Sequence, residues 1–555
     1  MGGDAIPVIN FSYRDLCSLL GENVPQETLV ERIPLIGADM HDTEAGSDDM
    51  SVEFFPDRPD LFSVEGLARS LRAFLSIETG MKEYPVCKPS LRAIVDRSAK
   101  DVRPYFSCAV VRDISIDDAL LRSVMELQEK LHMTIGRKRS KFAIGVHDLD
   151  KVVPPFRYHA VPSGEISFVP LAKTEAMGLE RILSENDKGK EYAHLLNGHS
   201  KFPIITDSNG DVLSFPPIIN GALTTVTVGT RNLFIDVTGT DAKAVKGALD
   251  IVVTSLAERG GRIEAVILDD GKERCSPDLA PVERSVSASE CEKFLGISIG
   301  PEGVAEALRR MGMEASADGD TVNVRIPATR LDIMHTVDVF EDVAVGYGFE
   351  RFGGTHEVVQ TVGGLLPDTS LSESLRDVMI GLGFTEVTTL TLSNPKDEFG
   401  LSGLPVTPVT KVLNPITEDH ACLRPYLMPS LMRILKHNKH RDLPQRIFEI
   451  GYVVRGHKTS LRLCALHTAS KTTFTEIKSV SEGILKEMGA EYALEASLIP
   501  TFVEGRGASV RSGGSEIGMF GELSPKVVTD FEMTHPVLML EFDLSTAVGK
   551  AGRLF

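Results

Sequence analysis

The chain has 555 residues, of which 42% are hydrophobic and 25% are charged, values typical of a globular protein. Its length predicts about three to five domains rather than one core. A net charge of −19 argues against a protein that coats nucleic acid without sequence preference, and seven single cysteines with no Cys-x-x-Cys pair favour reduced thiols over disulfides or a zinc site. With neither a secretory leader nor an apolar run long enough for a membrane span, we expect a cytoplasmic protein without membrane contact.

The first block, residues 1–90, is a small mixed module. Strands are predicted over 5–11 and 50–55. Helices that each end at a glycine are predicted over 14–20 and 24–37.

A proline-fixed turn begins segment 56–75, PDRPDLFSVEGLARSLRAFL, and leads into a helix capped by Ser63. From the residues alone this is a structural turn across which Arg58 and Asp60 pair. The segment resembles the turn and helix of the N-terminal module of phenylalanine–tRNA ligase beta subunits, but departs from that family at Asp57, where asparagine is usual. The matching positions are Arg58, Pro59, Asp60, Leu61, Glu65, Gly66, Leu67, Ala68 and Arg69.

The second block, residues 95–270, is predicted to mix α and β structure. Strands are expected over 107–116 and 141–150, with an amphipathic helix over 119–136 between them. The inner positions of this helix are Leu121, Val124, Met125, Leu127, Gln128 and Leu131. The basic run GRKRSK (136–141) is either a solvated loop or a weak nucleic-acid signal.

Polar residues gather at predicted strand ends later in this block. Asn209-Gly210 predicts a hairpin turn, and Ser214, Asp236, Thr238 and Thr240 follow in or beside strands. The same residue types also make ordinary turns. No Ser–His–Asp order with a nucleophile elbow is present, so a covalent hydrolase is not indicated.

The sequence around the basic run resembles the opening of the B3/B4 domain of the same family. In that family the domain removes tyrosine wrongly attached to the tRNA. The archaeal and eukaryotic branch places the editing pocket on segments that correspond to LSFPPIIN and FIDVTGTD. The resemblance therefore implies editing roles for Ser214, Asp236 and Thr238.

The third block, residues 275–352, combines two helices over 291–315 with a hairpin over 318–327, a pattern typical of a winged-helix-like module. Asp332 is predicted to cap the helix that follows.

That helix carries an acidic face. Asp338, Glu341 and Asp342 recur at helical spacing, opposite an apolar face running from Ile333 to Tyr347. Such spacing fits either an acidic solvated surface or a site for a hard cation, Mg²⁺ before Zn²⁺.

Residues 330–352 resemble the metal-bearing segment of the family's B5 domain. The resemblance implies that Asp332, Asp338, Glu341 and Asp342 bind Mg²⁺, close to where the family's alpha subunit makes contact.

The last block, residues 360–555, resembles a class II synthetase core. Segment 370–395 looks like the dimer-forming helix and strand, and 412–454 looks like the second motif of such cores. An active core has a further ATP-gripping arginine near its C-terminus, but segment 516–531 contains none, so we expect a non-catalytic copy. The loop over 436–446 is equally compatible with plain surface and with tRNA phosphates.

Together these features predict a multidomain α+β protein with four parts: an N-terminal module, a B3/B4 editing-type domain, a winged-helix-like B5 domain and a class II synthetase-like antiparallel core. The implied function is that of a phenylalanine–tRNA ligase beta subunit of the archaeal and eukaryotic type. It would act in an α₂β₂ tetramer with tRNA, with ATP and phenylalanine bound by the alpha subunit. A non-enzymatic, metal-stabilised tRNA-binding scaffold is the alternative, and a free-standing editing hydrolase is a third hypothesis.

Overall fold

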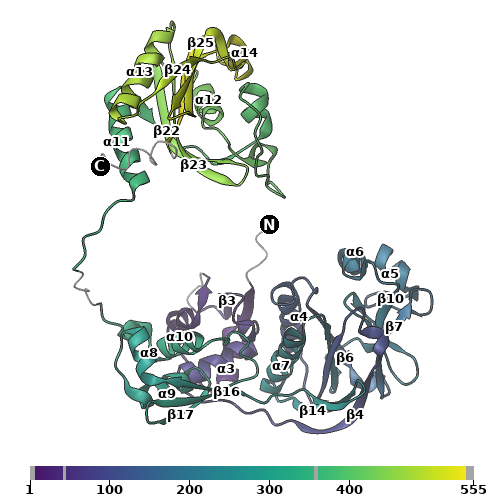
Figure 1. The fold of residues 1–555 in the computed structure, drawn as a ribbon. Coiled ribbons are helices and arrows are strands. Elements are labelled where there is room, and N and C mark those ends of the chain that lie inside the picture. The colour runs from purple at the N-terminus through teal and green to yellow at the C-terminus, as the bar shows by residue number, and fades with distance from the viewer. Residues whose placement is uncertain (1–6, 42–45, 355–359, 545–555) are drawn as a thin grey trace. The chain divides into compact units, whose positions relative to one another are not determined.

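The computed structural model describes residues 7–41, 46–354 and 360–544 (Figure 1). The chain divides into two compact units, residues 1–355 and residues 356–555, and each is described by itself. None of the described helices combines the length and the apolar character that crossing a bilayer would require.

The N-terminal module is a three-stranded sheet with helices packed beside it. Ser12 accepts a hydrogen bond from the N–H of Asp15 and so caps α1, while Gly21 ends that helix at φ 80°. Ser63 caps α3 in the same way, as predicted. The elements are β1 (Val8–Ser12), α1 (Tyr13–Leu20), α2 (Gln26–Arg32), β2 (Ala38–Met40), β3 (Asp49–Phe54) and α3 (Val64–Phe74).

A ten-stranded mixed sheet dominates the first unit, with parallel pairing only where β4 meets β14 and β7. In spatial order the strands are β12 (Ile219–Asn220), β11 (Val212–Phe215), β10 (Lys201–Thr206), β7 (Phe156–Pro162), β4 (Cys87–Val95), β14 (Arg262–Asp269), β5 (Tyr105–Arg112), β13 (Leu233–Gly239) and β6 (Phe142–Asp148), with β15 (Glu273–Ser276) paired to β14.

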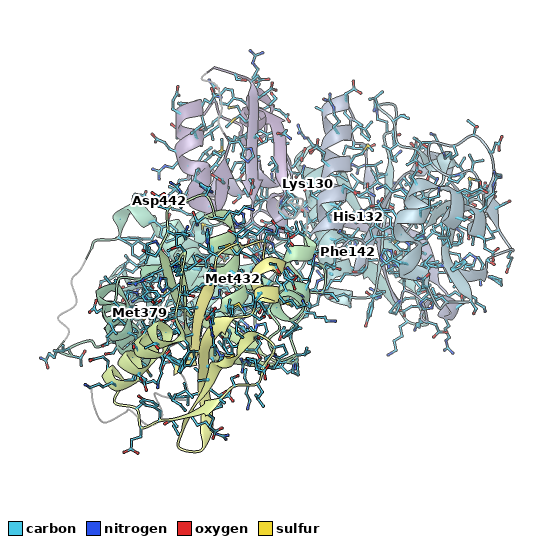
Figure 2. All side chains as sticks on the ribbon, turned by 90° about the horizontal axis from the view of Figure 1, so that it is seen from above. Lys130, His132, Phe142, Met379, Met432 and Asp442 are labelled. Carbon is cyan, nitrogen blue, oxygen red and sulfur yellow. The ribbon has the colours of Figure 1, made fainter. Side chains whose placement is uncertain are left out.

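Helices cover this sheet at two places. Figure 1 shows α4 (Asp118–Met133) and α7 (Ala242–Glu258) beside β6, where they bury one face of β5 and β13. At the other end, α5 (Leu179–Glu185) and α6 (Asp187–Tyr192) pack on β10 and β11, next to the short pair β8 (Ser167–Phe168) and β9 (Met177–Gly178). His132 of α4 lies beside Phe142 of β6 (Figure 2), with ring centroids 6.3 Å apart.

The rest of the first unit is a three-stranded sheet and three helices that share one core. They contact the N-terminal module directly, because Arg310 donates to the carbonyl of Phe74. The elements are β16 (Val282–Ser287), α8 (Ala288–Leu295), α9 (Gly300–Arg310), β17 (Glu314–Asp318), β18 (Thr321–Ile326) and α10 (Thr336–Tyr347).

The second unit is built on a seven-stranded sheet that is antiparallel except between β19 and β22. In spatial order its strands are β19 (Thr385–Glu386), β22 (Gln445–Arg455), β23 (Lys458–Thr468), β27 (Val537–Asp543), β26 (Ser515–Leu523), β25 (Phe502–Ser512) and β24 (Ala493–Ala496). Helices α11 (Pro367–Gly381) and α13 (Phe474–Glu487) pack on one face, and α12 (Met428–His437) and α14 (Pro525–Asp530) on the other (Figure 1).

Three sequence predictions about elements are wrong in detail. Met125 is 59% exposed rather than turned inward, because Leu120 and Leu127 define the buried side of α4. Val337, in the first turn of α10, is exposed and Val339 is buried instead, whereas Phe340, Val343 and Ala344 of the predicted apolar face are buried. The strand expected after α11 is reduced to β19 and β20 (Leu392–Ser393), of which β20 pairs with β21 (Cys422–Leu423).

Candidate functional site

Strand β13 brings two of the predicted editing residues to one buried face. It lies between β5 and β6, where Asp236 is directly opposite Cys108 and Gly145. Thr238 is opposite Phe106 on the same face. Asp236 is 1% exposed and Thr238 is 0% exposed, so neither side chain belongs to a solvated turn.

Ser214 reaches the same core from the far end of the sheet. It pairs with Ile205 of β10, which in turn pairs with Tyr158 of β7. The ring of Tyr158 stacks on Phe106 at 4.9 Å, and Phe106 is the cross-strand partner of Thr238. The structure therefore turns Ser214, Asp236 and Thr238 towards one core, although they come from strands that are not neighbours.

Two hydroxyl groups in this core have no hydrogen-bond partner. They are Ser214 Oγ and Thr238 Oγ1, both buried. An unpaired buried hydroxyl costs about 1–3 kcal/mol, so native cores usually pair such groups. Unpaired polar atoms are what a site for a hydroxyl-bearing ligand would present before the ligand enters.

Asp236, by contrast, is held by a buried chain of hydrogen bonds. Its Oδ2 lies 2.8 Å from His147 Nε2, and His147 Nδ1 lies 2.8 Å from Thr224 Oγ1. Gly145 is required beside this chain, since a Cβ there would lie 2.0 Å from Asp236 Oδ2. The chain fixes the orientation of the carboxylate.

A buried arginine, Arg103, lies beside the end of β13. Arg103 is buried and donates to the backbone carbonyls of Thr238, at 2.9 Å, and of Arg139, at 3.2 Å. Burial lowers the pKa of Arg103 to about 10, so it stays charged at neutral pH. Among the described residues, the charged neighbours that act on its pKa are Tyr158 and Arg139, and neither is a carboxylate.

The basic run forms a strained loop at the rim of this core. Arg137, Lys138 and Arg139 adopt φ values of 47°, 53° and 64°, the left-handed region that costs non-glycine residues about 1–2 kcal/mol each. Arg139 anchors the loop by donating to the carbonyls of Pro217 and Ile218, next to Ser214 in sequence. Arg137 and Lys138 are left exposed.

Sequence reasoning missed His147, Thr224 and Arg103. His147 had a usable signal, because it stands two residues after Gly145 in the strand that pairs with β13. Arg103 and Thr224 had none, since only the tertiary fold brings them to β13.

The acidic stretch of the third block forms a second, separate cluster. Arg330 Nη2 lies 2.6 Å from Asp332 Oδ2 and 2.6 Å from Asp342 Oδ2. Burial lowers the pKa of Arg330, but the carboxylates of Asp342 and Asp332 outweigh burial and raise it. The prediction that Asp332 caps α10 is wrong: the helix begins at Thr336, and Asp332 pairs with Arg330 instead.

The other two acidic residues differ in their surroundings. Asp338 closes a capping box, accepting from the N–H groups of Met334 and His335. Glu341 lies on the exposed side of α10. Its partial burial and the negative charges of Asp342 and Asp57 raise its pKa. The cluster thus retains unbalanced negative charge.

The proline-fixed turn of the first block packs against this cluster. Arg58 and Asp60 form two parallel hydrogen bonds of 2.9 Å, and the charge of Arg330 helps to lower the pKa of Asp60 after the effect of Arg58. Within the described parts of the chain, no three acidic, histidine or cysteine side chains converge closely enough to hold a metal. The oxygen-only donor set has the chemistry that Mg²⁺ favours, and the assignment of Asp332, Asp338, Glu341 and Asp342 as ligands stays a prediction.

The second unit neutralises its buried cations internally. Arg424 lies 2.8 Å from Glu449, and Arg462 lies 3.0 Å from Glu541 and 3.1 Å from Asp543. These groups share the face of the sheet that α12 covers. Since each of these arginines already has a carboxylate partner, neither is free to grip a nucleotide phosphate.

Three family models match the chain in sequence order. The B3/4 domain matches residues 115–259, the tRNA synthetase B5 domain matches 284–349, and the phenylalanyl tRNA synthetase beta chain CLM domain matches 355–544. These matches confirm the predicted multidomain α+β class with its B3/B4 and B5 parts.

Relatives extend over almost the whole chain. The phenylalanine–tRNA ligase beta subunit of Methanothrix thermoacetophila is 44% identical over 97% of this chain and 100% of its own length. That of Methanocaldococcus jannaschii is 40% identical, with coverage of 97% and 100%. A crystal structure of an N-terminal fragment of the Pyrococcus horikoshii beta subunit is 38% identical and covers 62% of this chain and 100% of the fragment, with a TM-score of 0.59. On this identity and coverage, the chain belongs to the phenylalanine–tRNA ligase beta subunit family.

Proposed function

We propose that this chain works with an alpha subunit, as an α₂β₂ tetramer in the cytoplasm, to attach phenylalanine to its tRNA with ATP. The observation that carries this proposal is the internal pairing of Arg424 and Arg462, because neither of these arginines is free to bind ATP. Adenylate formation then belongs to the alpha subunit. Leu413 and Ile416, which are 92% and 95% exposed, offer apolar surface for such a partner.

Phenylalanine-dependent ATP–diphosphate exchange tests the division of labour. The isolated chain should give background exchange, and exchange should appear when the alpha subunit is added. Robust exchange by the isolated chain would refute the proposal. Native mass measurement of the reconstituted protein checks the tetramer, and a chain that never associates favours the scaffold alternative.

We further propose that the first unit hydrolyses tyrosyl-tRNA. Tyrosine differs from phenylalanine by one hydroxyl, and a pocket that hydrogen-bonds this group rejects phenylalanine, because phenylalanine leaves the polar groups unpaired. The unpartnered hydroxyls of Ser214 and Thr238 and the oriented carboxylate of Asp236 support this reading. A water positioned among them cleaves the ester without a protein nucleophile.

Variants of the tetramer test the editing proposal. Asp236→Ala and Thr238→Ala should leave phenylalanine charging nearly unchanged. Each should slow tyrosyl-tRNA deacylation at least tenfold, about 1.4 kcal/mol of transition-state stabilisation. Met125→Ala, an exposed change on α4 of the same domain, is the control. Deacylation at the parent rate in both site variants would place the pocket elsewhere.

We also propose that Asp332, Asp338, Glu341 and Asp342 hold Mg²⁺. The raised pKa of Glu341 supports this, since burial and neighbouring carboxylates both disfavour its charge and a divalent cation would relieve the repulsion. Chelation should lower thermal stability or loosen the tetramer. In the double variant Asp338→Asn with Asp342→Asn, adding the chelator should no longer change the stability. If the chelator destabilises the double variant as much as the parent, the metal lies elsewhere.

A further inference from the structure

The strained loop of residues 136–141 joins α4 to β6, and none of the functions proposed above gives it a role. Three successive residues, Arg137 to Arg139, have φ values of 47°, 53° and 64°. The left-handed conformation is costly for residues other than glycine, so a chain keeps it only where the surrounding structure enforces it. Because such strain gathers at functional sites, the loop is a candidate binding element.

Hydrogen bonds hold this loop in one conformation. The N–H of Arg137 donates to the Thr134 carbonyl at 2.9 Å, and the N–H of Lys141 donates to the Gly136 carbonyl at 3.0 Å. Glycine is required where the loop leaves α4, since a Cβ at Gly136 would lie 2.8 Å from the Leu131 carbonyl oxygen. The loop is therefore rigid, and a ligand would not have to order it.

The loop is also hydrogen-bonded to both segments that carry the predicted editing residues. Arg139 donates to the carbonyls of Pro217, at 3.1 Å, and of Ile218, at 3.0 Å, just after β11. Thr240, just after β13, donates through its Oγ1 to the Ser140 carbonyl at 2.9 Å. These bonds fix the position of the loop beside the candidate editing core.

Arg137 and Lys138 are the two cations that this loop presents to solvent. Both are exposed, and neither side chain makes a hydrogen bond or an ion pair with another described residue. The loop's other two cations, Arg139 and Lys141, do have carboxylate partners. On a chain with a net charge of −19, two adjacent unpaired cations create a local surface that attracts a polyanion.

We propose that Arg137 and Lys138 bind the phosphate backbone of single-stranded RNA at the 3′ end of the tRNA. The inference rests on the proposed hydrolysis of tyrosyl-tRNA, in which the ester is attached to the last ribose. When that ester enters the core, the neighbouring phosphates lie at its rim. The guanidinium donates to two phosphate oxygens, and the ammonium adds a second charge. The position of the loop beside the core favours RNA over an acidic protein surface.

Single-turnover deacylation of tyrosyl-tRNA by the reconstituted tetramer tests the proposal. Varying the enzyme concentration separates the half-saturating concentration from the maximal rate. Arg137→Glu with Lys138→Glu should raise the half-saturating concentration at least tenfold and leave the maximal rate within about twofold of the parent. Lys88→Glu with Lys293→Glu makes the same charge change at two exposed positions outside the loop and should alter neither value.

The salt dependence of RNA binding supplies a second readout. A short single-stranded RNA with the sequence of the tRNA 3′ end is bound to the tetramer, and its affinity is measured by fluorescence anisotropy. Each phosphate contact to a single strand contributes about 0.7 to the slope of log affinity against log salt concentration. Arg137→Gln with Lys138→Gln should therefore reduce the slope by about 1.4, whereas a loop that only supports the fold would leave it unchanged.

The two measurements distinguish this inference from the editing proposal. If the parent binds the RNA through Arg137 and Lys138 but does not hydrolyse the ester, the editing proposal fails and the inference stands. If the parent hydrolyses the ester and the double glutamate variant matches it in half-saturation and RNA affinity, the inference is overturned. Failure of the parent to bind the RNA also overturns it. Loss of the tetramer in that variant, seen by native mass measurement, would assign the loop to the alpha subunit instead and overturn it too.

Discussion

Two buried clusters, one on each large sheet, differ in how their polar groups are paired. The sheet of the first unit leaves Ser214 Oγ and Thr238 Oγ1 without partners and keeps Arg103 without a carboxylate. The sheet of the second unit matches Arg424 and Arg462 with their own carboxylates. An unpaired buried polar group lowers the stability of the folded chain until a ligand supplies its hydrogen-bond partner. A group that is already paired gains no such stabilisation from a ligand. The contrast agrees with the ligand site proposed around Thr238 and with a structural role for the ion pairs of Arg424 and Arg462.

Backbone strain follows the same division. Three consecutive residues, 137–139, take left-handed conformations at the rim of the first sheet. Among the described residues of the second unit, Glu532 is the one non-glycine residue with positive φ. Strain of this kind is commonly held at functional sites.

The largest effect should come from breaking the second unit's ion pairs. Glu541 accepts from Arg462 and from the N–H groups of Leu427 and Met428, so Glu541→Ala leaves all three donors short of a partner. We expect a loss of about 3–5 kcal/mol, measured as a lower unfolding temperature of this unit. Glu495→Ala, which removes an exposed pair with Arg511, is the control and should change stability by less than about 0.5 kcal/mol. Equal effects would mean that the network does not lock the sheet.

A pH-dependent effect should come next. Burial raises the pKa of Glu398 from 4.5 to about 8, so the folded chain keeps a proton that the unfolded chain releases. Stability from this group is present below about pH 4.5 and is lost as the pH rises towards 8, by about 3 kcal/mol between pH 5 and pH 8. Glu398→Gln should remove that loss, so its advantage over the parent grows with pH. The unfolding temperatures of the parent and of Glu398→Gln are measured across this range, with the exposed Glu491→Gln as the control. A difference between parent and Glu398→Gln that does not change with pH would contradict the prediction.

On the first sheet, removing a polar group should cost activity without costing stability. Thr238→Val keeps the shape of the side chain and deletes a hydroxyl that has no partner. We expect unchanged or higher thermal stability and at least tenfold slower tyrosyl-tRNA deacylation, about 1.4 kcal/mol. Thr254→Val, which removes a hydroxyl that donates to the Asp250 carbonyl, should lose stability instead. If Thr238→Val destabilises as much as Thr254→Val, its hydroxyl is already satisfied.

The smallest effect should come from relieving the strained loop. Lys138 is exposed at φ 53°, a conformation that glycine adopts freely. Lys138→Gly should raise stability by about 0.5–1 kcal/mol, net of the entropy that glycine adds to the unfolded chain. Lys173→Gly, at an exposed position with ordinary φ, should lower it. A loss in both variants would show that the loop is not strained.

Local signals explain which features the sequence predicts well. Ser63 caps its helix as predicted, because capping depends on residues within one turn. The predicted cap at Asp332 is wrong, because the capping box of His335 and Asp338 starts the helix three residues later along the chain.

The rest depends on contacts between distant segments. No spacing rule links Ser214 on β11 with Thr238 on β13, since the order of strands in the sheet alone turns them towards one core. Arg330 likewise reads as an ordinary surface cation until its pairing with Asp342 is known. Chemistry could therefore be assigned to segments from the sequence, but their convergence could not.

The central claim is that the first sheet recognises the hydroxyl of tyrosine, and selectivity tests it most directly. The reconstituted tetramer is incubated separately with tyrosyl-tRNA and with phenylalanyl-tRNA, and the two deacylation rates are compared. We predict that the tyrosyl ester is hydrolysed at least tenfold faster, because phenylalanine leaves the Ser214 and Thr238 hydroxyls unpaired. Equal rates, or no hydrolysis of either ester, would contradict the account.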